Sequence, residues 1–233
     1  MHKNFESPML KREILTTADG SKTLYIPEWN EHYHSKHGAL QEAQHVFIAN
    51  GLAQFSAQDC SILEFGFGTG LNALLTLLSP HQKLKYHTLE KYPMTPDEVQ
   101  ALDYPKLFAE FFKQEENAIL PIFEKIHTVE WGEYQEITSD FSLKKQQADF
   151  KEVELPEGMY NLVYFDAFGK RVQPELWHES IFEKIYKSLK KNGLFTTYAC
   201  NGDTKRALKA VGFRVEKKPG PPGKREMINA WKD

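Results

Sequence analysis

Three glycines at alternate positions form the most chemically suggestive segment of the sequence. They lie in Glu64-Phe65-Gly66-Phe67-Gly68-Thr69-Gly70, between an apolar run and a second apolar run that starts at Leu71. Glycines at this spacing allow a tight turn and let the backbone approach a ligand closely, with a helix amino end behind them. The spacing differs from a dinucleotide fingerprint and from a phosphate loop. Glu64 disfavours a pyrophosphate and favours a cationic or zwitterionic ligand.

Carboxylates after the later apolar runs extend this candidate site. Glu90 lies 20 residues after Gly70 at the end of the next expected strand, where an acidic side chain accepts hydrogen bonds from the hydroxyls of a ribose. Asp149 follows another expected strand, where a carboxylate can accept a hydrogen bond from the amino group of adenine. Glu133 is the alternative residue for this role. Ligands of open α/β folds bind at the carboxyl ends of the strands. That edge would carry four carboxylates: Glu64, Glu90, Asp149 and Asp166.

Asp166 stands among aromatic residues, between Phe165 and Phe168. A carboxylate beside an amine orients it and takes its proton, which matters because an alkyl amine (pKa about 10) is mostly protonated at neutral pH. Aromatic rings such as Phe168 shelter a cation and attract a methylsulfonium. We therefore predict that Asp166 is the base for methyl transfer from a sulfonium to an amine. The alternative is a structural aspartate in a turn or helix cap.

Strands and helices alternate around these residues. Apolar patterns predict a mostly parallel seven-stranded sheet with helices on both faces and an antiparallel edge at 213–217 and 226–231. We expect core strands at 61–65, 85–90, 160–165 and 194–198, and helices at 71–78, from Thr95, and at 105–114, 117–123, 175–190 and 203–211. Residues 126–131 and 141–147 are expected to pair as a mid-chain hairpin.

A smaller N-terminal part precedes this core. Two short strands, 13–17 and 22–26, surround an Ala-Asp-Gly-Ser turn, and a helix is expected over 39–55. We predict that residues 1–57 form an extension packed on a methyltransferase domain of residues 58–233.

Composition narrows the class of protein. The 233 residues, 41% of them hydrophobic, suit one α/β domain with additions. Apolar runs stay well short of about 18 residues and the N-terminus has no signal-peptide core, so we expect no membrane association. Cys60 and Cys200 make neither a zinc cluster nor a disulfide framework. We therefore expect a cytoplasmic protein without a metal.

Charge is distributed unevenly along the chain. The net charge is −3, but residues 166–233 hold 15 Lys and Arg against 8 Asp and Glu, whereas residues 1–165 hold 14 against 24. A basic third beside an acidic body is typical of a protein that binds phosphates on one face. The alternative is that these lysines only solvate exposed helix faces.

Longer motifs carry a family resemblance. In order they are Tyr33-His34-Ser35-Lys36-His37-Gly38-Ala39-Leu40-Gln41-Glu42, Gly66-Phe67-Gly68-Thr69-Gly70-Leu71-Asn72, Glu90-Lys91-Tyr92-Pro93-Met94-Thr95, Phe165-Asp166-Ala167-Phe168 with Pro174-Glu175-Leu176-Trp177, Lys205-Arg206-Ala207-Leu208 and Gly223-Lys224-Arg225-Glu226-Met227. The glycine-rich segment is common to many methyltransferases, whereas the segments at Asp166 and Lys224 are more specific. Together they resemble the methyltransferase domain of the bifunctional tRNA 5-methylaminomethyl-2-thiouridine biosynthesis family MnmC, which also occurs as a stand-alone protein, MnmD.

The resemblance implies a Rossmann-like class I methyltransferase fold and S-adenosylmethionine as cofactor. It also implies methylation of the 5-aminomethyl group on the wobble (2-thio)uridine of certain tRNAs, with the anticodon stem-loop as partner and Asp166 as the catalytic residue. The implied cofactor-binding residues are Glu64, Gly66, Phe67, Gly68, Thr69, Gly70, Asn72, Glu90, Lys91, Asp149 and Asp166. The implied substrate-binding residues are Tyr33, His34, Ser35, Phe168, Lys224, Arg225 and Glu226.

Two departures from the family pattern stand out. The bifunctional enzymes carry a flavin oxidase domain after this one, whereas this chain stops at Asp233. We therefore expect no flavin here and a separate enzyme that supplies the aminomethyl precursor. Gly169-Lys170-Arg171-Val172 also differs from the family after the catalytic aspartate.

Three other functions remain in view. They are methylation of a small amine, aminopropyl transfer as in spermidine synthase, which shares the sheet topology, and RNA binding without catalysis. The basic C-terminal third favours tRNA over the first two. The intact glycines with Glu90 and Asp166 disfavour the third.

Overall fold

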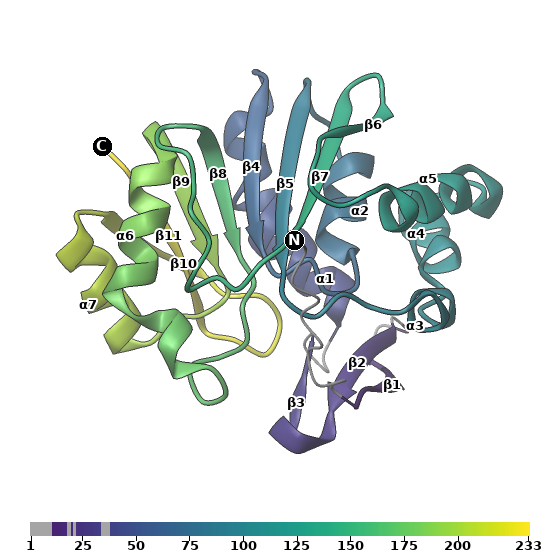
Figure 1. Cartoon of the computed structure of the whole chain (residues 1–233), viewed down its shortest axis with the longest axis horizontal. Coiled ribbons are helices and arrows are strands. Elements are labelled where there is room, and N and C mark those ends of the chain that lie inside the picture. Colours follow the sequence, from purple (N-terminus) through teal and green to yellow (C-terminus); the bar gives the residue numbers. More distant parts are fainter. Residues whose placement is uncertain (1–10, 18–19, 21, 34–37) are drawn as a thin grey trace, which may run out of the picture.

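Strands and helices alternate along the chain, so that the strands form one large sheet and the helices cover both of its faces (Figure 1). The computed structural model describes residues 11–17, 20, 22–33 and 38–233. The strands of the large sheet are β4 (Cys60–Phe65), β5 (Leu84–Glu90), β6 (Gln135–Thr138), β7 (Phe141–Gln147), β8 (Tyr160–Phe165), β9 (Leu189–Thr197), β10 (Arg214–Pro219) and β11 (Glu226–Trp231). The helices around it are α2 (Leu71–Leu78), α3 (Pro96–Ala101), α4 (Tyr104–Phe112), α5 (Glu116–Thr128), α6 (Glu179–Ser188) and α7 (Gly202–Val211).

The order of the strands confirms the predicted α/β class. It runs β10-β11-β9-β8-β4-β5-β7-β6, with β9, β8, β4, β5 and β7 parallel and the edge strands antiparallel. Within the described residues this sheet has eight strands instead of seven, because β6 also joins it. The ligand-binding edge expected from this topology is the carboxyl end of β4, β5 and β8.

The mid-chain hairpin forms with a different partner strand from the one predicted. Residues 126–131 were predicted as a strand, but α5 continues to Thr128. The reason is helical spacing: Ile119, Phe123 and Ile126 are all buried on one face of α5. The strand that pairs with β7 is β6, seven residues beyond the end of α5 at Thr128.

Alternate side chains of the central strands serve the two faces of the sheet. Ile62 and Tyr164 join the apolar cluster under α2, α4 and α5. Leu63 and Phe165 join the cluster under α6 and α7. This two-sided burial explains why the central strands β4 and β8 are mainly apolar instead of alternating between polar and apolar residues.

The segments before β4 form a smaller layer. β1 (Glu13–Thr16), β2 (Lys22–Ile26) and β3 (Glu31–His32) make an antiparallel sheet that lies below the large one in Figure 1. A short helix, 27–29, connects β2 and β3. The helix predicted over 39–55 is broken into α1 (Ala39–Ala43), a π-helical segment at 44–49 and a 3-10 turn at 52–55. The division of the chain at residue 57 stays a prediction.

Local sequence signals fix several element ends. Thr95 accepts a hydrogen bond from the Glu98 amide and Glu98 accepts one from the Thr95 amide, so the predicted helix start at α3 is confirmed as a capping box. The predicted helix 175–190 is shorter, because the 3-10 turn at 174–177 precedes α6. In the described part of the chain, no helix is long and apolar enough to cross a membrane.

Candidate functional site

A cavity of about 380 Å³ lies at the carboxyl ends of β4, β5 and β8. This volume is within the range of small-molecule sites. The sequence predicted many of its walls. Predicted residues that line it are Tyr33, Gly66, Phe67, Gly68, Asn72, Glu90, Lys91, Asp149, Asp166, Phe168 and Lys224.

The glycine-rich turn between β4 and α2 forms one wall. Its three glycines have φ of +100° (Gly66), +50° (Gly68) and +73° (Gly70), a region that favours glycine. A Cβ on Gly68 would lie 3.1 Å from Cδ1 of Tyr33. The turn therefore combines left-handed backbone with close packing against the N-terminal segment.

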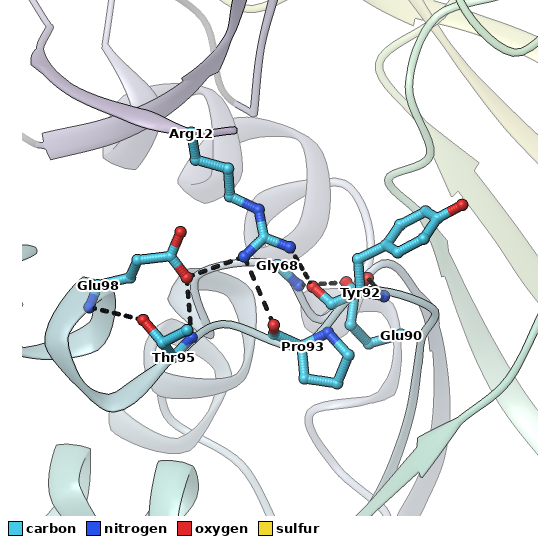
Figure 2. A network of polar contacts seen from close by, with 7 residues as sticks. All are labelled: Arg12, Gly68, Glu90, Tyr92, Pro93, Thr95 and Glu98. Carbon is cyan, nitrogen blue, oxygen red and sulfur yellow. Dashed lines mark hydrogen bonds and ion pairs between the residues drawn. The ribbon is translucent and has the colours of Figure 1, made fainter. Parts of the chain in front are cut away.

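Glu90 ties this turn to the loop that follows β5 (Figure 2). Its Oε2 accepts a hydrogen bond from the Gly68 amide at 2.9 Å, and its Oε1 accepts one from the Tyr92 amide at 2.7 Å. A carboxylate offers about four acceptor positions. Two acceptor positions therefore remain for hydroxyl donors on Glu90, which lines the cavity.

Arg12 anchors the same loop from the N-terminal segment (Figure 2). Its guanidinium donates to the Tyr92 carbonyl at 2.6 Å and to Glu98 Oε2 at 2.9 Å, and only 6% of its side chain is exposed. The guanidinium also lies 5.9 Å from the ring centroid of Tyr33. No local sequence pattern points to Arg12, because its partners are 80 to 86 positions away.

Asp149 and Lys91 form an ion pair in the cavity lining. Lys91 Nζ lies 2.8 Å from Asp149 Oδ2. Burial acts to raise the pKa of Asp149, but hydrogen bonds from Lys91 and the Lys151 amide outweigh it and lower the pKa. The alternative acid, Glu133, is exposed and does not line the cavity. Of the two candidates, the structure brings only Asp149 to the site.

Asp166 lies beside the glycine-rich turn, directly after β8. Asn72, in the first turn of α2, donates a hydrogen bond from Nδ2 to Asp166 Oδ2 at 2.8 Å. Burial raises the pKa of Asp166 to about 7, the Asn72 hydrogen bond opposes this rise, and the charges of Glu42 and Lys224 act in opposite directions. Burial therefore makes the Asp166 carboxylate more basic than an exposed aspartate, which suits a general base.

Glu64 lies behind the cavity wall. Its carboxyl is fully buried and accepts a hydrogen bond from Thr88 Oγ1 at 2.7 Å. Burial raises its pKa to about 8, against hydrogen bonds from Thr88 and Asn72. A neutral, enclosed Glu64 therefore stabilises the end of β4, just before the turn, through its hydrogen bond with Thr88.

Other predicted residues also lie away from the cavity, each for a local reason. Thr69 is buried and its hydroxyl accepts a hydrogen bond from Tyr104, and Gly70 faces His127 and Phe67. Arg225 is exposed, and Glu226 pairs with Lys217 at 3.0 Å. The predicted residues that the structure does not bring to the cavity are thus Glu64, Thr69, Gly70, Arg225 and Glu226. His34 and Ser35 lie outside the described residues.

The sequence also missed residues of the cavity wall, Glu42 and Tyr198 among them. Glu42 stands at the end of the first quoted motif, which was the one available signal. Tyr198, one residue after β9, had no signal beyond its place at a strand end.

Comparison with known proteins adds the chemistry. Residues 106–233 match a family described as S-adenosyl-L-methionine-dependent methyltransferase. The chain belongs to this family. The methyltransferase is 30% identical to the tRNA 5-methylaminomethyl-2-thiouridine biosynthesis bifunctional protein MnmC of Pseudoalteromonas atlantica, over 93% of this chain and 33% of that protein. The protein of the same name from Polaromonas naphthalenivorans is 31% identical, over 91% and 34%. The methyltransferase thus spans about a third of the length of these curated relatives.

Solved structures support the fold. The crystal structure of MNMC2 from Aquifex aeolicus superposes with a TM-score of 0.72 at 24% identity, over 97% of this chain and 71% of that one. Spermidine synthase from Thermotoga maritima gives 0.57 at 14% identity, over 97% and 71%. Both show the same mixed α/β architecture with a mostly parallel sheet.

The cavity suits S-adenosylmethionine as the methyl donor of this family. The glycines let the backbone of the turn approach a ligand closely. Glu90 keeps two acceptor positions that suit ribose hydroxyls. Asp149 adds a second carboxylate to the cavity lining. Among the described residues there is no group of three or more His, Cys, Asp or Glu placed to hold a metal ion.

Proposed function

We propose that this chain methylates the 5-aminomethyl group of (2-thio)uridine at the wobble position of tRNA. The product would be 5-methylaminomethyl-(2-thio)uridine, and a separate enzyme would supply the aminomethyl precursor. The names of the relatives in Pseudoalteromonas and Polaromonas support this substrate. The observation that carries the proposal is the Asp166 carboxyl, which lines the donor cavity with a pKa near 7.

When bound, S-adenosylmethionine supplies a sulfonium methyl group that moves to the amine nitrogen as the C–S bond breaks. Before that, Asp166 accepts the proton that the substrate ammonium must lose to free its lone pair. Asn72 fixes the orientation of the Asp166 carboxyl through its 2.8 Å hydrogen bond. Phe168 packs edge-on against Tyr33 and Trp29, with ring centroids 5.1 and 5.4 Å apart, and so adds an aromatic wall to the site.

Basic residues near the cavity support an RNA partner. Lys151 and Lys224 line it, and Arg225 is exposed next to Lys224. These side chains would contact phosphates of the anticodon stem-loop while the wobble base enters the cavity. A cytoplasmic setting follows from this substrate.

The test uses tRNA from cells that lack this methylation step. The tRNA is incubated with the chain and S-adenosylmethionine and then digested to nucleosides for mass spectrometry. We expect aminomethyluridine to be converted into methylaminomethyluridine. Unchanged aminomethyluridine, with cofactor binding demonstrated by calorimetry, would refute the substrate. Methylation of free small amines in its place would indicate a small-molecule enzyme.

A further inference from the structure

A second charged cluster shares the cavity with Asp166. It consists of Glu42 from α1, Tyr198 after β9 and Lys224 from the loop between β10 and β11, which all line the cavity. Lys224 Nζ lies 2.9 and 2.8 Å from the two oxygens of Glu42. The same nitrogen lies 3.9 Å from the ring centroid of Tyr198. Three distant segments thus surround one ammonium group.

The cluster is sheltered and fixed in place. The Glu42 side chain is 13% exposed and the Lys224 side chain 32%. Tyr198 donates a hydrogen bond from its hydroxyl to the Ala167 carbonyl at 2.9 Å, which holds its ring beside the segment that carries Asp166. Glu42, Lys224 and Asp166 all line the cavity, so the two carboxyls and the ammonium group share one enclosed space.

Two carboxyls and an aromatic face are the groups that bind an alkylammonium ion. Carboxylates accept strong, charge-assisted hydrogen bonds from its three N–H groups, and a tyrosine face attracts its charge. Under the proposed function, on which this inference rests, the substrate amine arrives as such an ion. Lys224 Nζ therefore has the same chemistry as the group that must bind beside Asp166.

We propose that Glu42 and Tyr198 form the binding site for the substrate ammonium, and that Lys224 holds this place until the substrate displaces it. Glu42 binds the substrate ammonium first. The ammonium then moves to Asp166, which takes a proton from it. Lys224, once displaced, is free to turn toward the RNA. The cost of displacing a paired lysine discriminates against uracil bases that carry no ammonium, because a neutral group cannot replace the lost ion pair.

The sign of the Lys224 effect distinguishes this proposal from a direct role of Lys224 in binding the substrate. The chain saturated with S-adenosylhomocysteine is titrated with the nucleoside 5-aminomethyluridine, which carries no phosphate. We expect Lys224→Met to bind the nucleoside several-fold more tightly, because the competing ammonium is gone. Glu42→Gln should bind it at least about tenfold more weakly. The uncharged 5-hydroxymethyluridine should not show the Glu42 effect.

Lys218→Met is the matched control. Lys218 lies on β10, which leads into the same loop, and pairs with Glu216 at 3.1 Å. The Lys218→Met substitution removes a lysine–glutamate ion pair that is not part of the cavity lining. Its affinity for the nucleoside should therefore match that of the wild type. Affinity for S-adenosylhomocysteine should stay unchanged in all variants and verifies folding.

The outcomes separate the two proposals. Weaker nucleoside binding by Lys224→Met, or unchanged binding by Glu42→Gln, in a chain whose wild type methylates tRNA overturns the ammonium site alone. A wild-type chain that binds the cofactor but neither methylates tRNA nor binds the nucleoside overturns the proposed function together with this inference.

Discussion

Burial and a neutral hydrogen-bond donor act in opposite directions on the pKa of Asp166, and burial is the larger of the two. Asn72 donates to its carboxylate, but burial dominates and raises the pKa to about 7. A base works in its ionised form, which predominates above the pKa. Activity should therefore rise as the pH increases through about 7.

The Asp166→Asn variant tests this role. We expect kcat to fall at least about a hundredfold, because the amide cannot accept the proton. The dissociation constant for S-adenosylmethionine should stay within about twofold, since other residues bind the cofactor. Kinetics from pH 5 to 9 and calorimetry measure both. An acid limb that persists near pH 7 in the variant would show that another group titrates.

At the scale of the elements, the turn between β4 and α2 depends on both backbone conformation and space at Gly68. Gly68→Ala places a Cβ 3.1 Å from the Tyr33 ring at φ +50°. Gly158→Ala is the matched control, because Gly158 has φ +60° and nothing within 4 Å of its added Cβ. Both variants should lose about 1 kcal/mol of stability to the left-handed backbone.

Only Gly68→Ala should also lose affinity for S-adenosylmethionine, since the turn and Tyr33 line the cavity. Denaturant unfolding and calorimetry of the two variants separate strain from crowding. Equal cofactor affinity in both would mean that the turn tolerates the added methyl group.

The N-terminal segment acts on the site through Arg12. Arg12→Ala removes the hydrogen bonds to the Tyr92 and Pro93 carbonyls and to Glu98, which fix the loop whose amide positions Glu90. We expect S-adenosylmethionine to bind several-fold more weakly, although Arg12 is not part of the cavity lining. Lys11→Ala is the control, because the Lys11 side chain is 74% exposed and pairs with the exposed Glu13 at 3.5 Å. Calorimetry that finds the two variants alike would exclude this support.

Elements bounded by strong local signals could be predicted closely. The glycines before Leu71 and the Ser79-Pro80 pair after Leu78 delimit α2 as predicted, and the apolar run 160–165 is β8. The strand predicted at 126–131 was wrong because a short run with apolar residues fits either a strand or a helix. The packing of α5 against α4 and α2 favours the helix.

Local patterns predicted the cavity residues that follow strands or lie in the glycine turn, such as Gly68, Glu90, Asp149 and Asp166. Tyr33 and Lys224, which also line the cavity, were predicted only from the family motifs. Arg12 and Tyr198 reach the site through contacts between distant segments, which no local pattern records, and Glu42 had no signal beyond its place in the first family motif. Glu64 was predicted to line the cavity because it precedes the glycine turn. The sequence does not reveal that its side chain points to Thr88 instead.

At the scale of the whole molecule, the uneven charge should govern RNA binding. Arg225→Ala should lower tRNA affinity and reduce the slope of log K against log salt by about one, because an exposed phosphate contact is lost. Lys106→Ala, an exposed change on α4 in the acidic part of the chain, should leave the slope unchanged. Filter binding over a range of salt concentrations measures both. Equal slopes would place the RNA elsewhere.

The most direct test of the central claim compares two tRNAs that differ only at the wobble base. One carries 5-aminomethyluridine and the other uridine, and both are incubated with the chain and methyl-labelled S-adenosylmethionine. We predict one labelled methyl on the aminomethyl nitrogen of the first tRNA and none on the second. Equal labelling of both, or labelling of neither by a chain that binds the cofactor, would contradict methyl transfer to a wobble amine beside Asp166.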